Sequence, residues 1–176
     1  MRCPGFLRRF LLRRCEDVMA RRRPDMFIGG TERPYMLRWW MPRSNWFGLY
    51  LHVFLRDDDD RALHDHPWQS LSILLSGELI ETYAPVPELA ADPGHQVTRT
   101  LRRGSIIWRG PRFAHRLALL RDFEGQPKQA VTLFFVGPRV RKWGFWCPKS
   151  SAAGGWRHWK DFVAKDDPGA VGPGCD

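Results

Sequence analysis

The chain has no long apolar run and little cysteine. No segment reaches the ~18 consecutive apolar residues that a membrane-spanning helix needs, and the stretch Pro4–Leu12 is too short and too interrupted by arginine for a secretory signal. The 4 cysteines include no C-x-x-C pair, which argues against a zinc ribbon and against a disulfide framework. We therefore expect a soluble, cytoplasmic protein in a reducing compartment, without a membrane span.

Several common catalytic signatures are also missing. The chain contains neither a G-x-x-x-x-G-K-[ST] nor a G-x-G-x-x-G loop for phosphate groups, and it has no G-x-S-x-G nucleophile elbow and no H-E-x-x-H zinc motif. Internal repeats and low-complexity tracts are absent as well. These absences argue against the nucleotide-binding, serine-hydrolase and zinc-protease classes that carry such motifs.

Hydrophobic residues make up 43% of the 176 residues and aromatic residues 13%, including 9 tryptophans, which suits a single globular domain with a real core. The net charge is +9. Because no nucleic-acid motif accompanies this charge, we interpret it as a solvated helix face, with weak nucleic-acid binding and membrane-surface or partner contact as alternatives. Much of the excess lies near the N-terminus, in Arg8, Arg9, Arg13, Arg14, Arg21, Arg22 and Arg23.

The spacing of apolar residues predicts a helix over Gly5–Arg22 that stops before Pro24, and then a mainly β region. Short apolar runs separated by turn-forming residues favour an antiparallel sandwich or closed barrel. The expected division is 1–34 for the basic helix and linker, 35–140 for the barrel, and 141–176 for a Trp-rich extension with a short helix at Arg157–Ala164 and a tail that frays beyond Lys165. The predicted strands are Tyr35–Trp40, Leu49–Leu55, Leu71–Leu75, Glu78–Tyr83, Gln96–Thr100, Ser105–Trp108, His115–Leu119 and Ala130–Phe135.

Three histidines form the candidate metal site. His64 and His66 are separated by one residue, so on a strand their side chains point to the same face and can share one metal ion. A third ligand has to come from another strand, and His115 begins one directly after a turn. Taken singly, each histidine is also compatible with a surface or core position. Together they favour a divalent metal ion, since imidazole suits iron, zinc and nickel.

Around these histidines the chain resembles the cupin superfamily. The first cupin motif, G-x5-H-x-H-x(3,4)-E-x6-G, is matched at His64, His66 and Gly77, and the second, G-x5-P-x-G-x2-H-x3-N, at Gly104 and His115. The resemblance covers about Leu49–Pro138 and implies a double-stranded β-helix, or jelly roll, with a metal ion on the three histidines. The chain departs from the motifs at Asp58 for Gly, Ser70 for the ligand Glu, Gly110 for Pro, Arg112 for Gly and Leu119 for Asn.

A closer resemblance is to the thiol dioxygenases, which bind ferrous iron with three histidines and no carboxylate. It rests on His64-Asp65-His66, on the segment Gly77–Thr82, and on Ser70 in place of the ligand Glu. Phe134 and Val136 occupy positions where the cysteine-oxidising members carry a His and a Tyr. These two side chains cannot transfer protons, so the resemblance points to an oxygenase acting on a substrate other than cysteine.

We accordingly predict a mononuclear metal enzyme of oxygenase type that acts on a small, anionic substrate. Iron is the expected ion, with zinc, nickel or manganese as alternatives, and Ser70 is not expected to bind it. A metal-dependent isomerase or lyase and a non-catalytic binding module, either of them as a homodimer, stay open. The candidates for lining the pocket or anchoring an anion are His52, Arg56, Trp68, Gln69, Ser70, Trp108, Arg109, Arg112 and Phe113.

Overall fold

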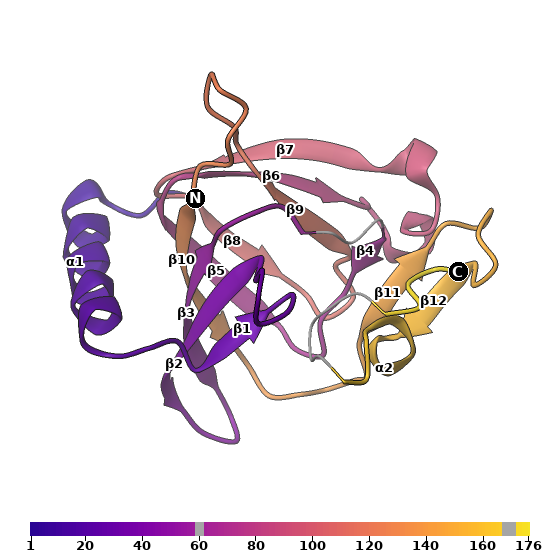
Figure 1. The fold of residues 1–176 in the computed structure, drawn as a ribbon, viewed down its shortest axis with the longest axis horizontal. Coiled ribbons are helices and arrows are strands. Elements are labelled where there is room, and N and C mark those ends of the chain that lie inside the picture. The colour runs from indigo at the N-terminus through magenta and orange to yellow at the C-terminus, as the bar shows by residue number, and fades with distance from the viewer. Residues whose placement is uncertain (59–61, 167–171) are drawn as a thin grey trace.

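The computed structural model describes residues 1–58, 62–166 and 172–176. It is mainly β, as predicted, with one long helix at the start of the chain and one short helix near its end (Figure 1). In chain order the elements are α1 (Gly5–Arg21), β1 (Met26–Ile28), β2 (Met36–Arg43), β3 (Gly48–Phe54), β4 (Leu63–His64), β5 (Ser70–Ser76), β6 (Glu78–Tyr83), the 3₁₀ turns Pro87–Leu89 and Pro93–His95, β7 (Val97–Arg102), β8 (Ile106–Arg109), β9 (His115–Leu119), β10 (Ala130–Val136), β11 (Gly144–Cys147), β12 (Gly155–His158) and α2 (Trp159–Phe162).

The strands form two antiparallel sheets. The first has the order β1-β2-β3-β10-β5-β8 and the second β12-β11-β4-β9-β6-β7. Strands that are distant in the chain are neighbours: β10 pairs with both β3 and β5, and β9 lies between β4 and β6. This arrangement confirms the predicted jelly roll, in which the inner faces of the two sheets enclose the interior.

The central strand β10 is covered on both faces, and alternation along the strand explains how. Thr132 and Phe134 line the cavity between the sheets. Leu133 points the other way and packs with Leu51 and with Cys15 of α1. The helix therefore covers the outer face of the first sheet. Figure 1 shows α1 beside β3 and β10. Its end, at Arg21, agrees with the predicted helix to within one residue.

Four short strands escaped the sequence analysis, namely β1, β4, β11 and β12. The predicted helix at Arg157–Ala164 is shorter than expected, since Gly155–His158 pairs with β11 as a hairpin and α2 begins only at Trp159. The division of the chain into 1–34, 35–140 and 141–176 stays a prediction.

The C-terminal tail differs from the frayed end expected beyond Lys165. Residues 167–171 of that tail lie outside the described residues. In the described part, the backbone N–H groups of Gly172 and Gly174 donate to the carbonyl of Phe162, and Cys175 forms a disulfide with Cys147. The argument for a reducing compartment from cysteine usage therefore fails, and the cytoplasmic location stays a prediction. Neither helix in the described part of the chain is long and apolar enough to cross a membrane.

Candidate metal centre

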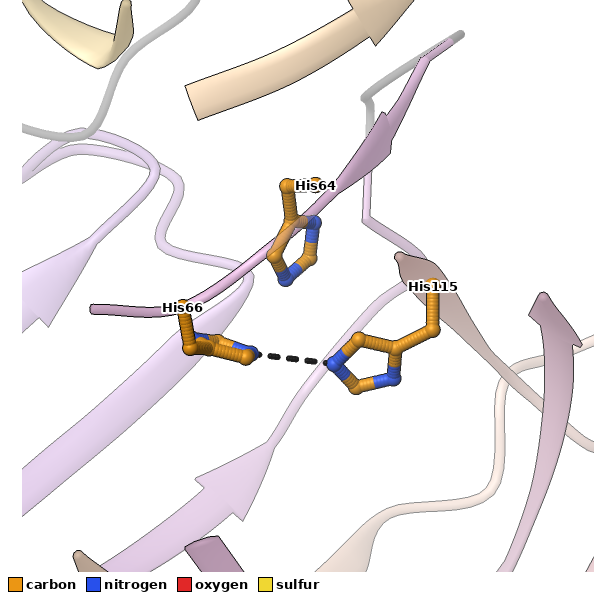
Figure 2. Close-up of side chains that lie close together, drawn as sticks. All are labelled: His64, His66 and His115. Atoms are coloured by element: carbon orange, nitrogen blue, oxygen red, sulfur yellow. Dashed lines mark hydrogen bonds between the residues drawn. The ribbon is translucent and has the colours of Figure 1, made fainter. Parts of the chain in front are cut away.

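The three histidines come together where the strands β4 and β9 pair with each other; they are His64, His66 and His115. His64 ends β4 and His115 begins β9, and the two residues are direct partners across this pair of strands. His66 follows β4 by two residues. Each ring offers one nitrogen, and these nitrogens all lie within 4.8 Å of one another. Figure 2 shows the three rings turned toward a common point.

The donor set fits a divalent metal ion. The Nε2 atoms of His66 and His115 are 3.0 Å apart, and two nitrogens bound about 2.1 Å from one ion at a right angle would lie about 3 Å apart. Among the residues that the structure describes, no carboxylate or thiolate joins the group. The three imidazoles thus form a neutral ligand set.

All three histidines are held in the neutral form that binds metal. Burial lowers the pKa of His64 and lowers that of His66 well below its usual value. Burial and the nearby charge of Arg109 lower the pKa of His115 to about 3, against a hydrogen bond to Glu81 that works in the opposite direction. The lone pairs of the rings are therefore available to a metal ion at neutral pH.

Glu81 of β6 fixes the orientation of His115, and the sequence analysis assigned it no role. Its side chain has no exposed surface, and its Oε1 accepts a hydrogen bond of 2.8 Å from Nδ1 of His115. With Nδ1 protonated, Nε2 of His115 presents its lone pair to the other two rings. A carboxylate behind a ligand histidine is a common way of orienting a metal ligand.

Two arginines hold Glu81 in turn. Nε of Arg109 donates to Oε1 over 2.7 Å, and Nε of Arg99 donates to Oε2 over 2.7 Å. Although burial opposes ionisation, the hydrogen bond from His115 and the charge of Arg109 hold the pKa of Glu81 well below its usual value. Arg109 also donates to the hydroxyl of Ser72. The charge of Arg109, a sequence candidate for binding an anion, is therefore neutralised by Glu81.

Asp65, between His64 and His66, points away from the site. Its Oδ1 accepts from the backbone N–H of Gly144 over 2.9 Å. Its Oδ2 accepts from the indole N–H groups of Trp146 and Trp156 and lies 2.9 Å from the guanidinium of Arg141. This fully buried carboxylate ties the hairpin of β11 and β12 to the segment that carries two of the three histidines.

The histidines border a cavity of about 80 Å³ between the two sheets. His52 lines it, as the sequence suggested, and accepts a hydrogen bond of 2.9 Å at its Nε2 from Arg38, which the sequence analysis missed. The residues lining the cavity are Tyr35, Met36, Arg38, His52, Phe54, Asp58, His64, His66, Ser72, Leu74, Leu79, Leu101, Ile107, Arg109, His115, Leu117, Thr132 and Phe134.

Other sequence candidates lie elsewhere, and alternation along β8 explains one of them. Ile107 and Arg109 face the cavity, so Trp108 points outward with 61% of its surface exposed. The prediction that it walls the pocket is wrong. Phe113 is not among the lining residues, although its ring contacts that of His115 at 5.6 Å between centroids.

The remaining candidates also stand apart from the cavity. Gln69 and Arg112 are exposed, and Trp68 is half-buried beside the histidine segment. Arg56 donates to the backbone carbonyls of Gly29, Arg33 and Asp57, so its guanidinium stabilises the surrounding loops. Ser70 is buried at the start of β5, opposite Arg109, but it does not line the cavity.

We expect the metal-free protein to lose stability as the pH falls below 6.5. Burial lowers the pKa of His52, His64, His66 and His115 in the folded chain, so below pH 6.5 the unfolded chain binds more protons than the folded chain. Each proton that only the unfolded chain binds adds up to about 1.4 kcal/mol per pH unit to the slope of the unfolding free energy against pH. Urea unfolding in EDTA from pH 8 to pH 4 measures this slope. His52→Gln should flatten it and the exposed His95→Gln should not; equal slopes would contradict the buried, neutral state.

No protein-family model matches the chain, and no curated protein is significantly similar to it. The chain is similar to several solved structures. An uncharacterized conserved protein with a double-stranded β-helix domain from Klebsiella pneumoniae is 17% identical, with 64% of this chain and 83% of that one covered and a TM-score of 0.46. An RmlC-like cupin from Shewanella frigidimarina is 13% identical, with 68% and 86% covered and a TM-score of 0.48.

A third solved structure is Fe(II)-HppE with an alternative substrate, which is 15% identical, with 66% of this chain and 58% of that one covered and a TM-score of 0.46. At these levels the similarities add nothing about function. The two facing antiparallel sheets, with the order β2-β3-β10-β5-β8 on one side and β4-β9-β6-β7 on the other, themselves identify the fold as a double-stranded β-helix.

Proposed function

We propose that the protein is a mononuclear metal enzyme of oxygenase type that acts on a small anionic substrate. His64, His66 and His115 hold the metal ion, and iron is the ion we expect. The observation that carries this proposal is the convergence of three neutral imidazoles on one wall of a cavity that the cation of Arg38 also lines. A metal ion held by these three neutral ligands would keep its full charge and would supply Lewis-acid or redox chemistry to a substrate in the cavity.

Arg38 supplies the reason for an anionic substrate. Among the described residues no carboxylate lies within salt-bridge distance of its guanidinium, and its side-chain hydrogen bond goes to His52. Burial lowers the pKa of Arg38 but leaves it a cation at neutral pH, and both burial and this cation lower the pKa of His52, which stays neutral. A half-buried cation that lines the cavity, and that makes no ion pair with a described carboxylate, favours an anionic ligand.

The cation and the histidines face the same space. The ring of Phe134 lies between the two groups, with its centroid 5.2 Å from that of His52 and 6.1 Å from that of His66. Thr132 lines the same wall, and Asp58 lies beside His64, with 3.6 Å between its Oδ2 and Nδ1 of that histidine. A small molecule that reaches the three histidines can thus place an acidic group at Arg38.

The function is tested with protein made without a His-tag and loaded with ferrous iron under anaerobic conditions. Oxygen uptake is followed with a panel of small thiols, carboxylates and phosphonates, beside matched neutral compounds. The proposal predicts oxygen uptake with an anionic member of the panel. Turnover without oxygen uptake would favour an isomerase or lyase, and stoichiometric metal without any turnover would favour a binding module; either result would overturn the oxygenase.

We expect Arg38→Met to weaken binding of the anionic substrate. A charge-assisted hydrogen bond contributes about 1.5–3 kcal/mol, so KM should rise roughly 10- to 100-fold, with a smaller change in kcat and no loss of metal. The exposed Arg112→Met is the matched control, because it removes an arginine outside the cavity. Equal effects of the two variants, or an unchanged KM in Arg38→Met, would contradict the role of Arg38.

A further inference from the structure

α1 carries apolar side chains on both of its sides. Leu11, Cys15 and Val18 pack against the outer face of the first sheet. Phe6 and Phe10, one helical turn apart, lie away from that contact with 72% and 60% of their surface exposed. Two aromatic rings that stay in water bury no apolar surface, so they do not add to the stability of a helix that already packs its other face on the sheet. These rings mark a surface that contacts something else.

The same part of the chain is strongly basic. Among residues 1–15 no Asp or Glu occurs, and the first acidic residue of the helix is Glu16. The turn between β7 and β8 lies against this segment, since the backbone N–H of Cys3 donates to the carbonyl of Gly104 over 2.8 Å. The exposed arginines of the segment and of the turn are Arg2, Arg9, Arg13, Arg14, Arg102 and Arg103.

We propose that the first three turns of α1 and the turn before β8 form a docking surface for an anionic lipid membrane. Phe6 and Phe10 enter the boundary between head groups and acyl chains, and Arg9 and Arg13 contact lipid phosphates. Adjacent exposed aromatic residues beside arginines suit a lipid interface, and residues 1–15 carry no acidic side chain, although Arg14 pairs with Asp17 and Arg102 with Glu78. A nucleic-acid duplex offers the phosphates but no apolar layer for the two rings.

The docked molecule keeps its metal centre away from the lipid. In Figure 1 α1 lies at one side of the barrel, whereas β4 and the hairpin of β11 and β12 lie at the other side. The histidines belong to β4 and β9 and to the segment after β4. Docking through α1 therefore leaves the strands that carry the histidines on the side of the barrel away from the membrane surface.

The test is flotation of the full chain with vesicles. Vesicles of equal parts phosphatidylcholine and phosphatidylglycerol are compared with vesicles of phosphatidylcholine alone. The anionic vesicles should carry the protein and the neutral ones should not, and binding should fall as salt is raised. Arg9→Gln with Arg13→Gln, and separately Phe6→Ser with Phe10→Ser, should each lower the partition coefficient roughly tenfold or more.

The matched control is Trp46→Ser with Phe47→Ser. It also removes two exposed aromatic rings, but from the hairpin between β2 and β3. Its binding should equal that of the unchanged chain, and circular dichroism should show that every variant is folded. Absence of binding to anionic vesicles, equal binding to neutral ones, an equal loss in the control, or displacement from vesicles by sub-stoichiometric single-stranded DNA would each overturn the proposal.

Discussion

His64→Ala combined with His66→Ala should abolish metal retention. The two residues supply two of the three ligands, and a single imidazole from His115 holds a divalent ion too weakly to survive gel filtration. Elemental analysis of the purified, untagged protein should show stoichiometric metal in the unchanged chain and less than about one tenth of it in the double variant. Activity with any substrate found for the protein should disappear with the metal.

The matched control for this double variant is His95→Ala with His158→Ala, which removes two histidines that lie outside the cavity. Full metal content in the control and none in His64→Ala with His66→Ala would assign the metal to the predicted site. Retained stoichiometric metal in the latter variant would show that the ion binds elsewhere, and it would remove the basis of the proposed function.

Two local rules, together with the resemblance to the two cupin motifs, predicted that the three histidines converge. Alternation along an extended segment places His64 and His66 on one face, although β4 itself ends at His64, and a new strand begins at His115 after a turn. The structure adds what no local rule contains, namely that β4 and β9 are neighbours and that His64 is the direct partner of His115. That pairing depends on the course of the whole chain.

The supporting residues were harder to predict, since their partners are distant in the sequence. Glu81 lies on the same side of β6 as Leu79, so a carboxylate at an inward position was a visible signal. Its partners lie on β7, β8 and β9. Arg38 was harder to predict from the sequence, because the chain is rich in arginine and nothing local separates an arginine that lines a cavity from a solvated one.

Errors in the predicted pocket came from side-chain direction. Trp108 was a candidate for the cavity because it flanks the predicted ligands, but a shift of one residue along a strand turns a side chain to the other face. The hairpin of β11 and β12 was missed because its strands are short and glycine flanks them. The hydrogen bonds of Asp65 explain why this hairpin nevertheless belongs to the site.

Glu81→Gln should destabilise the protein by about 3–5 kcal/mol, because it removes the anion that neutralises a buried cation. The side chain of Arg109 is only 2% exposed and its guanidinium lies 2.7 Å from Oε1 of Glu81. The amide of Gln keeps the shape but carries no charge, and its NH2 group faces N–H donors. Urea unfolding at pH 7 in EDTA measures the loss without any contribution from metal.

Arg99→Gln is the control within the same network. The side chain of Arg99 is 40% exposed and its loss leaves Glu81 paired with Arg109, so we expect a destabilisation of no more than about 1 kcal/mol. If Glu81→Gln and Arg99→Gln destabilise the protein equally, Glu81 does not stabilise the protein mainly by neutralising the charge of Arg109.

Metal affinity distinguishes two roles for Glu81: stabilising the fold alone, or stabilising the fold and also orienting His115. Without the carboxylate, Nδ1 of His115 loses its acceptor, so the ring no longer has a fixed tautomer and its Nε2 is not held toward His64 and His66. Metal affinity, measured by competition with a chelator under conditions in which the variant is fully folded, should then fall about 10- to 100-fold in Glu81→Gln and stay unchanged in Arg99→Gln. An unchanged metal affinity in the folded Glu81→Gln variant would limit Glu81 to its role in stability. It would show that the ring of His115 binds metal equally well without the carboxylate, so that the carboxylate does not orient it.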